Sequence, residues 1–179
     1  GLLSVRDSDF VDNQAANQGA AIRSTAITTL IERSSLRENA SPSGGAALSV
    51  SNATDVTVLT STFHRNTAGS RADSVAVVGV RASTIAGQIQ QGLQVLSGAV
   101  IPTVSVRATV FAANADHCQF IGGFGANSMA WNHVDVADAL CAPAASNSSV
   151  GPALLAPEAR RDDDGTSWHR VPLTGSPLI

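Results

Sequence analysis

Residues 5–13 read Val-Arg-Asp-Ser-Asp-Phe-Val-Asp-Asn, and the chemistry of this stretch returns four more times along the chain. In every copy a β-branched residue is followed, at fixed offsets, by a small hydroxyl residue, a large apolar anchor and a carboxamide. The four columns are Val5, Ile31, Val58, Val80 and Val106; Ser8, Ser34, Ser61, Ser83 and Thr109; Phe10, Leu36, Phe63, Ile85 and Phe111; and Asn13, Asn39, Asn66, Gln88 and Asn114. A unit that recurs after a little over twenty residues predicts a solenoid, in which each unit packs only on its neighbours.

The spacing inside one copy predicts the path of the chain. The anchor and the hydroxyl residue two positions before it lie on the same face of an extended strand. The β-branched residue has the opposite parity, so the chain must turn a corner between them. We therefore predict an all-β, right-handed parallel β-helix, with about five coils in residues 1–116 and an irregular closing region of the same domain in residues 117–179. No helical i, i+3, i+4 pattern is sustained, although a short helix over Thr84–Leu96 stays open.

The carboxamide column predicts a second corner, because Asn accepts the left-handed conformation and bonds backbone groups in turns. Stacked carboxamides can also bond one another along the axis. Small residues, Gly19-Ala20-Ala21 and Gly44-Gly45-Ala46-Ala47, let the chain turn closely. They precede the aliphatic residues Ile22 and Leu48, each twelve positions after its anchor, and Val75 holds that place in the third copy.

The composition fits thin, repeated layers and gives no sign of a nucleic acid partner. Hydrophobic residues make up 44% and aromatic residues only 4%, so the core must be mainly aliphatic. The formal net charge of −3 gives no electrostatic reason to bind nucleic acid or an anionic membrane. No apolar run reaches the ~20 residues that span a bilayer, and we expect no membrane insertion by this segment. The chain begins inside a repeat without a signal peptide, and we expect a fragment or a processed product.

Two features resemble known bacterial proteins. The pairing of Phe10-Val11-Asp12-Asn13 with Gly19-Ala20-Ala21-Ile22 resembles the FxxN and GGAI elements of polymorphic outer-membrane-type β-helix proteins. The tail segments 163–169 and 173–179 resemble the end of the choice-of-anchor Q family, although this chain has one Gly where that family has two and stops before its terminal Asp. The resemblance implies a pectate-lyase-like β-helix on a bacterial surface or in the medium, in a longer chain with a separate anchor. It implies no established catalytic activity.

Cys118 and Cys141 are the only cysteines, and they bracket a stretch that breaks the repeat. In the resembled family a similar pair precedes the closing segment. A disulfide between them would fit a secreted chain and would stabilise it by about 3 kcal/mol. Two buried free thiols are the alternative. A metal site is not expected at the cysteines, because no CxxC spacing or His cluster accompanies them.

His64 and Arg65 are the best candidates for a catalytic pair. β-Helix polysaccharide lyases use a basic residue to abstract a proton, often with Ca²⁺ to neutralise the substrate carboxylate. Arg6, Arg81 and Arg107 each follow the Val column by one residue and could add a basic stripe. Such lone charges at β-helix corners are also typical of solvated surface, and the aspartates are scattered over different repeat positions.

Asp162, Asp163 and Asp164 precede a glycine and could hold Ca²⁺ in a turn, or form a polar closing loop. No other cofactor is expected.

These patterns predict a non-enzymatic bacterial surface or secreted module that acts as a stalk, an adhesin or an assembly component. The alternative is a polysaccharide lyase or glycoside hydrolase that acts on an acidic glycan. We expect the partner to be a protein or a glycan on a lateral face. The first coil would present an unpaired edge, which a subunit or further coils should cover.

Overall fold

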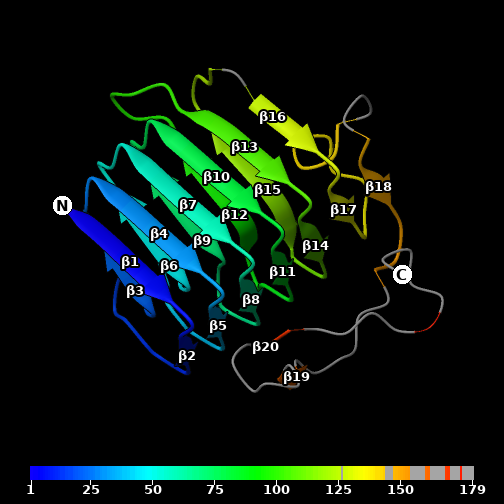
Figure 1. The fold of residues 1–179 in the computed structure, drawn as a ribbon, viewed down its shortest axis with the longest axis horizontal. Coiled ribbons are helices and arrows are strands. Elements are labelled where there is room, and N and C mark those ends of the chain that lie inside the picture. The colour runs from blue at the N-terminus through cyan, green and yellow to red at the C-terminus, as the bar shows by residue number, and fades with distance from the viewer. Residues whose placement is uncertain (126, 144–146, 154–159, 162–167, 170–173, 175–179) are drawn as a thin grey trace.

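The computed structural model describes residues 1–125, 127–143, 147–153, 160–161, 168–169 and 174. Its regular structure is β-strand, and three parallel sheets form a right-handed solenoid (Figure 1). Sheet A contains β1 (Leu2–Arg6), β4 (Thr28–Glu32), β7 (Asp55–Leu59), β10 (Val77–Arg81), β13 (Thr103–Arg107) and β16 (Asn127–Ala130). Sheet B contains β2 (Asp9–Val11), β5 (Ser35–Arg37), β8 (Thr62–His64), β11 (Thr84–Ala86), β14 (Val110–Ala112), β17 (His133–Val134) and β18 (Ser149–Val150). Sheet C contains β3 (Ile22–Ser24), β6 (Leu48–Ser51), β9 (Ser70–Asp73), β12 (Gln91–Leu96) and β15 (Asp116–Ile121).

The predicted parallel β-helix of about five coils is therefore confirmed. Residues Thr84–Leu96 form strands of sheets B and C and not the short helix that stayed open. A separate antiparallel pair joins β19 (Arg160–Arg161) to β20 (Trp168–His169). The described part of the chain contains no helix long and apolar enough to cross a membrane.

Each coil passes through sheets A, B and C in turn, and successive coils keep the predicted columns in register. The Val column pairs in sheet A and the anchor column pairs in sheet B. Both columns continue into a partial sixth coil, through Met129 and Val134. Coil strands thus extend beyond residue 116, where we predicted the closing region to start. The pattern was hidden because other residue types, a methionine and a valine, take the column positions there.

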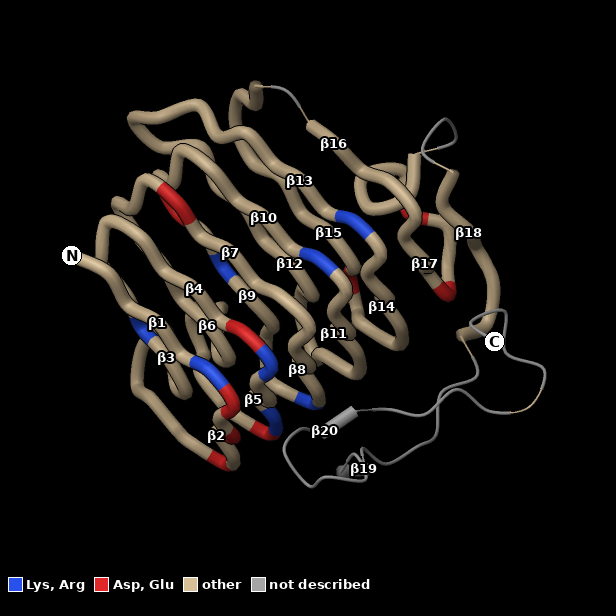
Figure 2. The backbone as a smooth tube through the Cα atoms, in the orientation of Figure 1, with Lys and Arg blue, Asp and Glu red and all other residues tan. Residues whose placement is uncertain are grey.

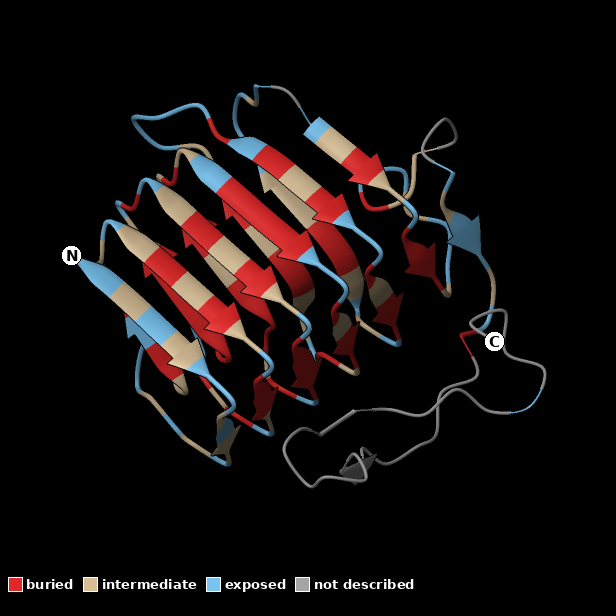
Figure 3. Cartoon of the chain, viewed as in Figure 1, coloured by how far each residue is buried: buried red, intermediate tan, exposed pale blue. Residues whose placement is uncertain are grey.

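The core is a set of apolar columns inside the solenoid. Ile31, Leu36, Phe63 and Phe111 are 0% exposed. Buried and more exposed residues alternate along most strands of sheet A, as expected when every second side chain points inward (Figure 3). In the first coil Phe10 is only partly buried, because no coil of the described residues packs on its outer side.

The left-handed residues lie one position before the carboxamides, and not at them as predicted. Positive φ angles occur at Asp12, Glu38, Arg65, Gly87 and Ala113. These residues turn the chain at the exit of sheet B, which leaves each following carboxamide free to point inward. At the corner between sheets A and B, the residue one position before each hydroxyl residue likewise has a positive φ angle.

The five carboxamides form a continuous ladder, in which Asn39, Asn66 and Gln88 are buried. From the second coil on, each side-chain oxygen accepts the backbone N–H of the carboxamide one coil earlier, at 3.0–3.1 Å. Each side-chain N–H₂ donates to the carbonyl of the anchor one coil earlier, joining Asn39 to Phe10, Asn66 to Leu36, Gln88 to Phe63 and Asn114 to Ile85. A buried amide therefore satisfies two backbone groups of its neighbour.

The hydroxyl column forms a second ladder at the corner between sheets A and B. The N–H of Ser34 donates to Oγ of Ser61 at 3.2 Å, and the same bond links the neighbouring coils. Each hydroxyl donates in turn to the carbonyl two residues earlier in its own coil. Asn132 continues the ladder, since its Oδ1 accepts the N–H of Thr109 at 3.1 Å.

Sheet C corrects one assignment. Leu48 pairs with Ser70, so Val75 does not hold the place of Leu48 in the third coil. The connection from sheet B to sheet C is shorter in the third coil than in the first two, which shifts the strand toward its anchor. Val75 is buried instead at the corner before β10.

Candidate functional site

His64 and Arg65, the predicted catalytic pair, lie where the chain leaves β8. His64 is only 4% exposed, which leaves a substrate little access to the imidazole. Arg65 holds a left-handed corner position with φ 51°. Neither residue lines the two hollows described below. A catalytic role for this pair stays a prediction.

Arg6, Arg81 and Arg107, the predicted basic stripe, share one column on the outer face of sheet A. The stripe is interrupted, because an acidic and an apolar residue hold the two positions after Arg6. Nε of Arg6 lies 3.0 Å from Oε2 of Glu32, and Nη2 of Arg107 donates to Oγ of Ser128 at 2.7 Å. Two basic positions on adjacent coils remain, on β10 and β13 (Figure 2).

The candidate Ca²⁺ ligands Asp162, Asp163 and Asp164 lie outside the described residues, and Ca²⁺ binding there stays a prediction. Within the described part of the chain, no three His, Cys, Asp or Glu side chains converge as metal ligands would.

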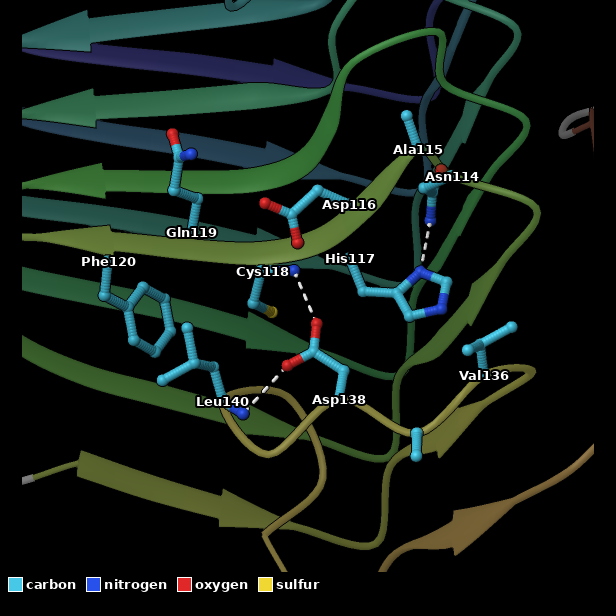
Figure 4. A pocket seen from close by; sticks show the side chains of 11 residues that line it. Asn114, Ala115, Asp116, His117, Cys118, Gln119, Phe120, Val136, Asp138 and Leu140 are labelled. Carbon is cyan, nitrogen blue, oxygen red and sulfur yellow. Dashed lines mark hydrogen bonds between the residues drawn. The ribbon is translucent and has the colours of Figure 1, made fainter.

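A hollow of about 440 Å³ opens beside β15, and we call it the end pocket (Figure 4). Its walls are residues 114–120 on one side and residues 136–138 and 140 on the other. Among the described residues the sixth coil adds strands to sheets A and B but none to sheet C, so β15 is the edge of that sheet. A loop crosses there in place of a strand, and the space between loop and edge is the pocket.

Asp138 fixes that loop to the edge of β15. Its Oδ1 accepts the N–H groups of Leu140 at 2.8 Å and Cys141 at 3.1 Å. Its Oδ2 accepts the N–H of Cys118 at 3.1 Å. Because no described strand pairs with this edge of β15, that N–H would otherwise lack a partner. The predicted disulfide joins Cys118 to Cys141, with 5.6 Å between their Cα atoms. A carboxylate with three N–H donors and a covalent bond therefore hold the same loop.

Removal of this disulfide should destabilise the chain. We expect the double substitution Cys118→Ser, Cys141→Ser to lower the free energy of unfolding by about 3 kcal/mol, because the open chain gains conformational entropy when unfolded. Urea unfolding of the oxidised parent, the double variant and the reduced parent measures this. The reduced parent should match the variant, and equal stability of all three would contradict the prediction.

A buried histidine closes one side of the end pocket. His117 is 5% exposed, and its ring lies 6.2 Å from that of Phe111. Its Nδ1 lies 3.2 Å from Nδ2 of Asn114, which can only donate, so Nδ1 accepts and the ring proton of the neutral form lies on Nε2. That Nε2 lies 2.8 Å from Oδ1 of Asp135. The two groups lie close together, but Oδ1 of Asp135 has no hydrogen-bond partner among the described residues, so the contact is not an oriented catalytic pair.

Asp116 lines the same pocket, and its surroundings there shift the pKa of its carboxyl group. Burial raises the pKa of Asp116 above its ordinary value of 3.8, and the nearby carboxylate of Asp138 raises it further, while His117 acts in the opposite direction. A carboxyl that keeps its proton more readily than usual can donate it, which makes Asp116 a candidate proton donor in the pocket.

The raised pKa of Asp116 makes the stability of the folded state depend on pH in a defined direction. A protonated Asp116 favours the folded state, so its contribution is present below the unfolded pKa and is lost as the pH rises through the folded pKa. We expect Asp116→Asn to be more stable than the parent at about pH 7 and nearly equal at about pH 3. Thermal unfolding of both proteins at the two pH values checks this. A parent that is the more stable at about pH 7 would contradict the assigned direction.

A row of polar side chains runs along the outer face of sheet C toward the end pocket. The row consists of Arg23, Ser49, Arg71, Gln94 and Gln119, one residue per coil in direct register. These positions alternate with buried residues of the interior, so their side chains leave the outer face of the sheet. Arg23 is exposed and Arg71, Gln94 and Gln119 are half-buried, whereas Ser49 is buried. We call it the sheet C row. Its full length is four strand spacings, or about 19 Å.

Contacts with neighbouring loops hold the sheet C row in place. Oγ of Ser49 donates to Oε1 of Gln18 at 3.2 Å, and Nη1 of Arg71 donates to the carbonyl of Ser43 at 3.3 Å. Nε2 of Gln94 donates to Oε1 of Gln119 at 2.5 Å. A side hollow of about 220 Å³, lined by Asn17, Gln18, Arg23 and Ser43, opens at the first coil. The row thus extends from the side hollow to the end pocket, which Gln119 also lines.

The sequence analysis predicted neither the end pocket nor the sheet C row. Asp116, His117 and Asp138 belong to no repeated column, and only their closeness to Cys118 and Cys141 was a signal. Comparisons of the chain with protein-family models, curated proteins and solved structures found no match.

Proposed function

We propose that this chain is a non-enzymatic module of a bacterial surface or secreted protein, and that it binds an elongated glycan along the outer face of sheet C. The observation that carries the proposal is the sheet C row, a line of hydrogen-bonding side chains with one member per coil. Neighbouring coils are about 4.8 Å apart, which is comparable with the length of one pyranose unit. A glycan that lies along the axis would therefore advance about one sugar per coil and could contact Arg23, Arg71, Gln94 and Gln119, while the buried Ser49 lies beneath it.

The disulfide supports an extracellular location, because such bonds persist mainly in oxidising compartments. The resemblance of the tail to bacterial surface proteins agrees with it. The first coil supports a further contact: β1, β2 and β3 are edge strands, and Leu2 is 68% exposed. Unpaired edges of parallel sheets recruit other strands, so we propose that a partner subunit or further coils pack on this end.

Cleavage of a glycan is the second candidate function, and the end pocket is the observation that favours it. Asp116 could protonate a leaving oxygen. Neither His64 nor Arg65 lines this pocket, and their catalytic role stays a separate prediction.

An array of bacterial surface polysaccharides tests the binding function. We expect the parent to bind at least one polysaccharide, and the variant Gln94→Ala, Gln119→Ala to lose about tenfold in affinity, since each amide lost removes a hydrogen bond to the ligand. The matched control is Thr57→Ala, Ser105→Ala on the outer face of sheet A, which should bind like the parent. Equal loss in both variants would contradict binding at sheet C. Release of new reducing ends or unsaturated uronates, abolished by Asp116→Asn, would favour the second candidate instead.

A further inference from the structure

We infer that the sheet C row selects an acidic glycan in which every second sugar unit carries a carboxylate. The inference rests on the proposed function and adds the class of ligand. Its basis is the order of charges along the row, since Arg23 and Arg71 occupy alternate coils with Ser49 between them.

The spacing of the two arginines sets the spacing of the ligand's charges. Two strand separations place their Cα atoms about 10 Å apart. A glycan along the axis that advances one sugar per coil would place its first and third units opposite Arg23 and Arg71. The unit between them would lie over Ser49, which is neutral and only 3% exposed, with its hydroxyl bonded to Gln18. A uronate at every second position therefore matches both cations with no carboxylate left opposite a neutral residue.

Both guanidinium groups are suited to this contact. Arg23 is exposed and forms no salt bridge with any described residue. Nη2 of Arg71 lies 3.5 Å from Oδ2 of Asp73, a loose pair whose carboxylate side is 40% exposed and thus weak. Its Nε is buried and has no hydrogen-bond partner. A ligand carboxylate could take the place of Asp73 and form the bidentate contact that arginine favours.

The other end of the row limits where carboxylates can lie. Gln94 and Gln119 are neutral and offer both donors and acceptors, which suits hydroxyl or acetamido groups. Beyond them the end pocket presents Asp116 and Asp138, which would repel a further uronate. The row therefore has a cationic half, a neutral half and an acidic limit, and this order also gives the bound glycan a direction.

Sheet A supplies a matched control within the same molecule. Arg81 and Arg107 lie on its outer face in adjacent coils, one strand separation apart. They carry the same number of positive charges as the sheet C pair at half the spacing. A ligand attracted by positive charge alone would respond equally to either pair.

Calorimetric titration of the full, disulfide-bonded chain tests the inference with three oligosaccharides of equal length. Hyaluronan carries a uronate at every second unit, oligogalacturonate at every unit, and cello-oligosaccharide at none. We expect hyaluronan to bind most tightly, and Arg23→Gln and Arg71→Gln each to weaken it by about tenfold. Arg81→Gln and Arg107→Gln should leave the affinity within about twofold of the parent.

Each alternative result has a defined meaning. Oligogalacturonate that binds as tightly as hyaluronan, or equal losses in the sheet A variants, would overturn the alternate-charge inference. Cello-oligosaccharide that binds best, with loss in Gln94→Ala, would overturn it while the proposed function stands. No binding of the three by a chain that does bind an array polysaccharide would also overturn only the inference. Because Arg71 is partly buried, Arg71→Lys serves as a second variant: it keeps the charge and should lose affinity only in part, since it lacks the bidentate geometry.

Discussion

Replacing Asn66 by alanine is expected to lower the free energy of unfolding by about 4 kcal/mol. Asn66 is 0% exposed in the middle of the carboxamide ladder. Its Oδ1 accepts both the backbone and the side-chain N–H of Asn39, at 3.0 and 2.8 Å, and its Nδ2 donates to the carbonyl of Leu36 at 2.9 Å. The truncation strands these groups in a site closed to bulk water, and each buried group without a partner costs about 1–3 kcal/mol.

The end of the ladder provides the control for Asn66→Ala. Asn13 is partly exposed in the first coil, and its Nδ2 donates to Oδ1 of Asn39. Water can replace that contact, so Asn13→Ala should cost less than about 1 kcal/mol. Urea unfolding of the two variants and the parent measures the difference. Equal losses of stability in the two variants would contradict the prediction that the buried hydrogen bonds of Asn66 stabilise the fold more than the partly exposed one of Asn13.

Gly69→Ala is expected to be equally severe, at about 4 kcal/mol, above the usual cost of overpacking. A Cβ built on Gly69 would lie 2.0 Å from the carbonyl oxygen of Gly92 in the next coil. The obstacle is backbone, so no side chain can rotate away, and the two coils would have to separate. This close approach is the structural reason for a residue without a side chain before β9.

A second glycine separates this steric effect from the general effect of replacing glycine. Gly79 lies in the middle of β10, and the nearest atom to a Cβ there would be Oγ1 of Thr57 at an ordinary 3.8 Å. Gly79→Ala should therefore be neutral or stabilise by about 0.5 kcal/mol, because alanine restricts the unfolded chain. Thermal unfolding of both variants is the measurement. Similar losses at the two positions would rule out the contact with Gly92 as the cause.

The sequence predicts those parts of the fold in which one physical requirement recurs in every coil. An inward aliphatic side chain, a corner hydroxyl and an inward amide are each needed once per coil, so the same chemistry appears five times. Asn132 shows the limit of that reasoning, since its Oδ1 accepts the N–H of Thr109 where a serine hydroxyl is the acceptor in earlier coils. The geometry requires an acceptor at that place and does not require serine or threonine.

The candidate binding features could not be predicted in the same way. The sheet C row contains arginine, serine and glutamine, and it becomes a row only through register. That register depends on the connections from sheet B to sheet C, which are long in the first two coils and short afterwards. Counting from the anchors placed Val75 opposite Leu48 for this reason. Asp116 and Asp138 meet only because a loop takes the place of a strand, and no periodicity carries that information.

The central claim is that Arg23, Ser49, Arg71, Gln94 and Gln119 lie one per coil along a single outer face. Nitroxide labels at pairs of these positions measure it directly, since both native cysteines are in the disulfide. The pair 23/119 spans four coil steps and the pair 71/119 spans two, so electron spin resonance should find the first distance longer by about 10 Å. Equal distances for the two pairs would contradict the register on which the proposed function rests.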